Sequence, residues 1–228
     1  MAVDAPANAS AEIARAAAGS DQGILMHLLE RSRECLSSFS GPELAHYLRR
    51  WPRSIASDPP VARSLPVVRI LEDSIGAAPA FSDRLLAALR GAAHLLNWRQ
   101  TYPAQEMDVH FSHNYGWTEL VGPRGLVPGT EISCGILLLG ARTLYPRHVH
   151  EAEEIYLPLL GRAYWQRGDE AWALRPAGAL IHHARDIPHA MRTDQEPLIA
   201  LYLWRSADLS QSARMDPLMV ATSGRHPE

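Results

Sequence analysis

The sequence predicts a mainly β fold, an antiparallel sandwich or barrel, with an α-helical layer at its N-terminal side. Two observations indicate this class. Apolar residues recur at helical spacing in the first hundred residues, and short runs of β-favouring residues separated by turn signals follow Tyr102. We expect a helical region over residues 1–104 that packs on the barrel, a β-barrel over 105–210 and a polar tail over 211–228.

The helical region contains three expected helices with local start signals. Asp21 precedes the first, Ser40 and Pro42 begin the second, and Ser82 caps a third over residues 83–99. The helices carry more apolar surface than a solvated bundle needs, which is why we expect them to cover the barrel.

The β region consists of short runs at a spacing of roughly 8 to 12 residues, which is typical of sandwiches and barrels and not of alternating βα units. The runs are DVHF, WTELV, EISCGILLLG, RTLYP, EIYLPLL, RAYWQR, AWALRP, GALIHH, HAMRT and LIALYLWR.

Composition excludes several classes of function. A net charge of −3 argues against nucleic-acid binding, and no apolar run approaches the length of a membrane span. All 22 basic residues are arginine, so chemistry through a lysine Schiff base is excluded. Cys35 and Cys134 form no CxxC pattern and the N-terminus shows no secretory signal, so we expect a cytoplasmic protein, monomeric or homodimeric, that binds a small molecule.

The candidate chemistry lies in an H-x-H-x3-E pattern formed by His148, His150 and Glu154. Because side chains alternate faces along a strand, the two histidines share a face, and Glu154 shares one with Tyr156 on a strand expected to return as a hairpin. A fourth ligand from a distant strand would complete a metal site, and His189, eleven residues after Gly178, is suitably placed.

These two segments resemble the paired motifs of the cupin superfamily, whose fold is a jelly-roll barrel, the double-stranded β-helix. The first motif matches through Gly161, whereas the second carries Ala184, Asp186 and Thr193 in place of proline, glycine and asparagine. Three imidazoles and one carboxylate suit one divalent transition metal ion, Fe, Mn, Zn, Ni or Co, without selecting among them. We expect His182 and His183, beside the second motif, to form hydrogen bonds and not to bind the metal.

A narrower resemblance is to the cupin-type dimethylsulfoniopropionate (DMSP) lyases of the DddL and DddQ group, most like DddL in length and layout. It is carried by Tyr145, the E-x-Y formed by Glu154 and Tyr156, and the strand with Tyr202 and Trp204. The resemblance implies β-elimination of DMSP to dimethyl sulfide and acrylate.

The chemistry of this substrate suggests roles for these residues. A metal would bind the substrate carboxylate, and Tyr156 would be the base that takes the α-proton, because a nearby dication favours phenolate. Tyr145 would orient the substrate or serve as the alternative base. Trp204 and Tyr202 would contact the sulfonium.

Two alternatives stay open on sequence alone. The same ligands host other cupin metalloenzymes, such as dioxygenases and isomerases, and cupins also bind small molecules without catalysis.

Overall fold

The computed structural model describes residues 20–39, 41–52, 55, 59–73 and 78–216. The expected helix cap at Ser40 and the part of the tail over residues 217–228 lie outside the described residues.

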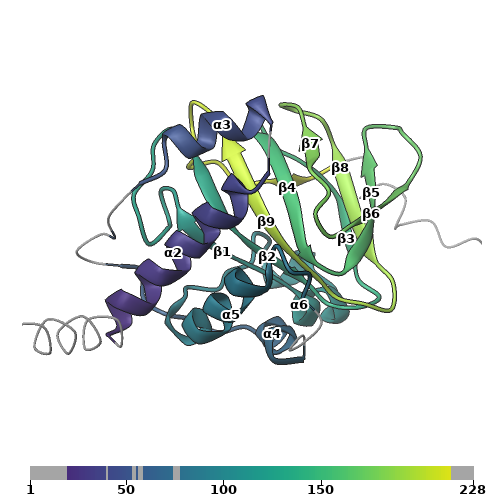
Figure 1. Ribbon diagram of the computed structural model, residues 1–228. Helices are drawn as coiled ribbons and strands as arrows, with labels where there is room; N and C mark the ends of the chain where they lie inside the picture. Colours follow the sequence, from purple (N-terminus) through teal and green to yellow (C-terminus); the bar gives the residue numbers. More distant parts are fainter. Residues whose placement is uncertain (1–19, 40, 53–54, 56–58, 74–77, 217–228) are drawn as a thin grey trace, which may run out of the picture.

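The N-terminal side of the described chain is helical (Figure 1). Its α-helices and 3-10 helices are α2 (Asp21–Ser37), α3 (Pro42–Arg49), η1 (Pro66–Arg69), α4 (Ile70–Asp73), α5 (Asp83–Ala92), η2 (Ala93–Leu95), η3 (Ala104–Glu106) and α6 (Val109–Asn114). The Ser20 hydroxyl caps α2 by accepting the Gly23 N–H at 3.1 Å.

Two local predictions are wrong in detail. Ser82 precedes α5, but its hydroxyl donates to the carbonyl of Leu159 at 2.7 Å, so it ties the helix to a strand instead of capping it. The run beginning at Asp108, predicted as a strand, starts helix α6, because the Asp108 carboxylate accepts the Phe111 N–H at 2.8 Å. A four-residue run is too short to outweigh a good N-cap.

The strands of the described residues form two five-stranded antiparallel sheets, with orders β1-β2-β9-β4-β7 and β10-β3-β8-β5-β6. Their bounds are β1 (Tyr115–Val121), β2 (Ser133–Leu139), β3 (Leu144–Val149), β4 (Glu153–Leu160), β5 (Arg162–Arg167), β6 (Ala173–Pro176), β7 (Ile181–His183), β8 (His189–Thr193), β9 (Leu198–Arg205) and β10 (Arg214–Met215). The two sheets do not close into one hydrogen-bonded barrel. The expected fold class is confirmed as mainly β, with two antiparallel sheets and helices at the N-terminal side.

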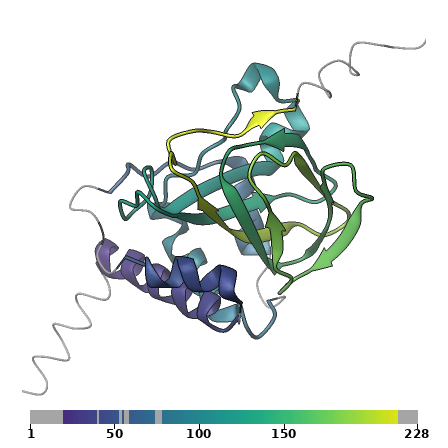
Figure 2. The ribbon, with the colours of Figure 1, turned by 90° about the horizontal axis from the view of Figure 1, so that it is seen from above.

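The helices cover the outer face of the first sheet, as Figure 2 shows for the purple and blue helices. Along β4, Leu157 and Leu159 pack in one core with the helices, whereas Tyr156 packs in a second core between the sheets. β9 alternates in the same way, with Leu201 in the first core and Tyr202 in the second. Because both faces of these strands are buried, they read as nearly continuous apolar runs.

Within the predicted tail, β10 pairs with β3 at the edge of the second sheet, and residues 211–213 line the pocket described below. Arg147 Nε donates to the Asp216 carboxylate at 2.6 Å and fixes this end of the described chain. Among the described helices, none is both long and apolar enough to cross a bilayer.

Candidate metal centre

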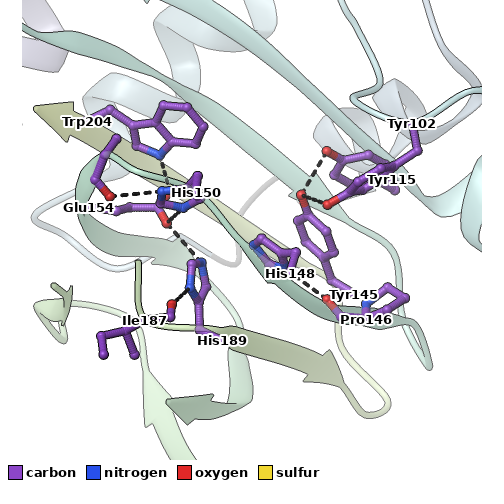
Figure 3. Close-up of polar contacts among 11 residues, drawn as sticks. Tyr102, Tyr115, Tyr145, Pro146, His148, His150, Glu154, Ile187, His189 and Trp204 are labelled. Atoms are coloured by element: carbon purple, nitrogen blue, oxygen red, sulfur yellow. Dashed lines mark hydrogen bonds and ion pairs between the residues drawn. The ribbon is translucent and has the colours of Figure 1, made fainter. Parts of the chain in front are cut away.

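Three buried histidines meet between the sheets. His148 lies in β3, His150 follows that strand, and His189 begins β8 directly opposite His148 in the strand register. One ring nitrogen of each lies within 4.8 Å of the other two. Figure 3 shows the three rings turned toward a common region.

Each of these rings is oriented by a backbone carbonyl. Nδ1 of His148 donates to Pro146 O at 2.8 Å, and Nδ1 of His150 donates to Ala152 O at 2.9 Å. The His189 Nδ1 donates to the carbonyl of Ile187 at 2.9 Å (Figure 3). A carbonyl only accepts, so the Nδ1 atoms carry the protons and each Nε2 keeps its lone pair for a ligand.

Glu154 faces the histidines from the other sheet. Its Oε2 lies 2.9 Å from His150 Nε2 and 3.1 Å from His189 Nε2, while Trp204 Nε1 donates to Oε1 at 2.6 Å. The hairpin expected between β3 and β4 is wrong, because β3 belongs to the second sheet and β4 to the first. The four predicted ligands still come together, since the connection crosses from one sheet to the other.

The donor set fits a cation. With protons on the Nδ1 atoms, the carboxylate of Glu154 and the Nε2 atoms of His150 and His189 are acceptors that face one another, which requires a positive charge between them, either a proton or a metal ion. Burial alone would raise the pKa of Glu154, but the two imidazoles hold that pKa well below its usual range. Burial lowers the pKa of His148 well below its usual value, so this ring is neutral and free to bind a metal.

The two predicted tyrosines lie on different sides of the cluster. Tyr156 is buried in β4, two residues from Glu154 on the same face, with its ring centroid 6.5 Å from that of His189. Burial, and after it the charge of Glu154, raises the pKa of Tyr156 well above 10. Tyr145 stacks on His148 with centroids 4.0 Å apart, and burial likewise raises the pKa of its phenol well above 10.

A pocket opens onto this cluster. Its lining includes His148, Glu154, both predicted tyrosines and both predicted substrate-binding residues, Tyr202 and Trp204. The strand register places Tyr202 opposite Tyr156 and Trp204 opposite Glu154. The indole of Trp204 also packs on His150, with centroids 4.3 Å apart. All the candidate site residues therefore lie in or directly beside one pocket, which makes their proposed roles geometrically compatible.

Sequence reasoning missed two groups of residues around the site: two tyrosines beside Tyr145, and further residues of β1 that line the pocket. The hydroxyls of Tyr102 and Tyr115 lie 3.3 Å and 3.1 Å from the Tyr145 hydroxyl (Figure 3). Nothing in their local sequence indicates this contact, because they come from a loop and from β1. In the strand register, however, Tyr115, Trp117 and Glu119 alternate on one face of β1, a pattern that the sequence contains.

The two histidines beside the second motif behave differently. His182 is exposed and pairs with Glu153 at 2.9 Å, as expected. His183 is 1% exposed and stacks on His189 with centroids 4.1 Å apart, and its ring nitrogens have no hydrogen-bond partner among the described residues. Burial lowers the pKa of His183 to about 3, so the ring is neutral. The expected hydrogen bond is therefore formed by His182 and not by His183.

Known proteins resemble this chain in sequence and in fold. The family model described as dimethylsulfoniopropionate lyase matches residues 45–200. The DMSP lyase DddQ of Ruegeria pomeroyi is 30% identical over 72% of this chain and 81% of its own length. A Cereibacter sphaeroides protein named provisionally as the DMSP lyase DddL is 26% identical over 68% of this chain and 67% of its own.

A solved structure extends the likeness to three dimensions. A chain from the crystal structures of the DMSP lyases RdDddP and RnDddQII superposes with a TM-score of 0.77 at 32% identity, covering 86% of this chain and 100% of that chain. The motifs, the jelly roll and the family match agree, and the expectation of a lyase is confirmed at the level of the family. The chain belongs to the dimethylsulfoniopropionate lyase family, in the DddL/DddQ group.

Proposed function

We propose that this protein cleaves DMSP by β-elimination to dimethyl sulfide and acrylate, at a divalent transition metal held by His148, His150, Glu154 and His189. The observation that carries the proposal is the orientation of the three imidazoles. Each is fixed through Nδ1 to a backbone carbonyl, which leaves Nε2 available in or beside the pocket of a chain that belongs to a lyase family. A bound divalent cation would act as a Lewis acid on the substrate carboxylate and would offset the charge of Glu154 beside Tyr156.

The substrate has two charged ends that the pocket can distinguish. The carboxylate would lie at the histidines, and the sulfonium at the aromatic wall of Trp204 and Tyr202, where a cation is attracted to the faces of electron-rich rings. Since Trp204 Nε1 is already bonded to Glu154, only the ring of Trp204 remains to contact the substrate.

Tyr156 is the proposed base. It lies two residues from Glu154 on the pocket face, so it can reach a carbon adjacent to a carboxylate bound at the histidines. Its phenolate would take the α-proton, the electron pair of that C–H bond would form the C=C bond of acrylate, and the C–S bond would break with its pair leaving on neutral dimethyl sulfide. Tyr145, whose hydroxyl lies beside those of Tyr102 and Tyr115, is better placed to orient the substrate.

The test is direct. Purified protein is loaded separately with Fe, Mn, Zn, Ni or Co and incubated with DMSP. Headspace dimethyl sulfide and dissolved acrylate are then measured, and we expect equal amounts of the two products. The same reaction without oxygen separates the lyase from a dioxygenase, because elimination consumes none. If no loaded form releases dimethyl sulfide above the rate of the His189→Ala variant, the proposal fails.

A further inference from the structure

A second carboxylate lines the pocket, at a distance from the histidines. Glu119, in β1, is 6% exposed and lines the pocket together with Trp117 of the same strand and Tyr202 of β9. In the strand register Glu119 lies opposite Gly135, Gly135 opposite Tyr202, and Tyr202 opposite Tyr156. Neighbouring strands are about 4.8 Å apart, so the backbones of Glu119 and Tyr156 are separated by three strand spacings, roughly 14 Å along the sheet.

The absence of a side chain at Gly135 allows the Tyr202 ring to pack directly against its backbone. A methyl group at Gly135 would lie 2.1 Å from the Thr118 carbonyl oxygen and 2.5 Å from the Tyr202 hydroxyl. The phenol of Tyr202 therefore lies over Gly135, on the side of Glu119. The ring of Trp117 stands nearly perpendicular to that of Tyr202, with centroids 6.3 Å apart. Two aromatic rings and a carboxylate thus share this end of the pocket.

The charge of Glu119 is supported by hydrogen bonds and is partly offset by an ion pair with Arg124, which lines the same pocket. One oxygen accepts the backbone N–H of Arg124, and the other accepts the Ser133 hydroxyl at 2.9 Å. The guanidinium of Arg124 lies 3.9 Å from the carboxylate but donates its own hydrogen bonds to the carbonyls of Leu209 and Ser210. Burial raises the pKa of Glu119, whereas the two accepted hydrogen bonds favour its ionised form. Because the Arg124 guanidinium is 3.9 Å away and not hydrogen-bonded to it, the ionised carboxylate keeps part of its negative field in the pocket, where screening by water is weak.

We propose that Glu119 is a specificity-determining residue, whose buried carboxylate beside Trp117 and Tyr202 selects substrates with a cationic group at the end remote from their own carboxylate. The inference rests on the proposed function and deepens it. Aromatic rings accept a cation or an apolar group of the same shape, whereas a carboxylate attracts only the cation. Glu119 would therefore discriminate by charge where the rings discriminate by shape.

The variant Glu119→Gln tests this with little change in shape. Its amide oxygen can still accept the Arg124 N–H, and its amide nitrogen can donate to the Ser133 hydroxyl. On the metal-loaded enzyme we expect the KM for DMSP to rise about tenfold, from the loss of one charge interaction, with kcat within about twofold. The inhibition constant of 4-methylpentanoate, in which a C–H group replaces the sulfonium, should not change. Glu196→Gln removes an exposed carboxylate near Arg162 and is the matched control.

Two results would overturn the inference. If Glu119→Gln changes the KM for DMSP and the inhibition constant of 4-methylpentanoate by the same factor, Glu119 only shapes the pocket. If neither constant changes, the charge of Glu119 does not affect binding. If the wild type releases no dimethyl sulfide, the proposed function fails on its own. Calorimetry on the wild type and Glu119→Gln gives the affinities of 3-(trimethylammonio)propanoate, which is cationic at its remote end, and of 4-methylpentanoate, which is not. These affinities still test whether Glu119 favours the cationic ligand. A ratio of the two affinities that is the same in both proteins refutes it.

Discussion

Trp204 offers a sharp test of how the ligand set is held. Its indole N–H donates to Glu154 Oε1 at 2.6 Å, and this bond turns the other oxygen of Glu154 toward His150 and His189. The variant Trp204→Phe keeps an aromatic ring to pack on His150 and removes only the donor and part of the ring. The buried carboxylate would then have lost one of its hydrogen bonds.

The size of the effect follows from that one bond. A hydrogen bond to a charged group contributes about 1.5 to 3 kcal/mol. A chain of this size loses about 2 to 4 °C in Tm per kcal/mol, so the metal-free variant should melt roughly 3 to 12 °C below the wild type. Loss of a residue that orients a ligand typically weakens metal binding about 10- to 100-fold.

The assay is a competition between the protein and a chromogenic chelator for Zn²⁺, read by absorbance. The matched control is Trp172→Phe, because Trp172 lies outside the pocket and packs against the Arg192 guanidinium, 5.3 Å from its ring centroid. Zinc affinity in Trp204→Phe within twofold of both the wild type and this control would refute the idea that Trp204 orients Glu154.

Four further results are expected. Tyr156→Phe should lower turnover of DMSP by at least about 100-fold with unchanged metal content, and retained activity would remove Tyr156 from the role of base. His189→Ala should lose both bound metal, measured by atomic emission, and activity, whereas a fully metallated variant would show that His189 is not a ligand. Gly135→Ala should cost about 1 to 3 kcal/mol in urea unfolding. In Gly91→Ala the new methyl group in α5 meets no atom within 4 Å, so the free energy of unfolding should instead rise by about 0.5 to 1 kcal/mol. If both glycine variants change the free energy of unfolding in the same direction, the packing described here is contradicted. Burial raises the pKa of the Cys35 thiol to about 11, so Ellman's reagent at pH 8 should modify it only after unfolding, and rapid reaction of the folded protein would show an open core.

Local patterns predicted which residues come together in the candidate metal centre. The spacing of His148, His150 and Glu154 follows from strand alternation and a short connection, both of which act over a few residues. His189 was predicted through its distance from Gly178, which has a positive φ of 86° in the structure. The pairing of Tyr156 with Tyr202 places two predicted site residues side by side, and it required only that both strands turn the same face inward.

Tertiary structure decided what sequence reasoning could not. β3 and β4 look like a hairpin because they are adjacent in the chain, yet each pairs with strands far away in sequence and they lie in different sheets. The contact of Tyr145 with Tyr102 and Tyr115 joins three segments with no shared pattern. The hydrogen bond from Trp204 to Glu154 depends on strand register, which a single sequence does not specify.

The division of the ligands between the sheets has a consequence for maturation. His148, His150 and His189 belong to one sheet and its adjoining loop, and Glu154 belongs to the other. A nascent chain with only one sheet formed therefore has an incomplete coordination shell. If these residues hold a metal ion as proposed, metal binding would follow the packing of the two sheets, and the bound ion would resist their separation.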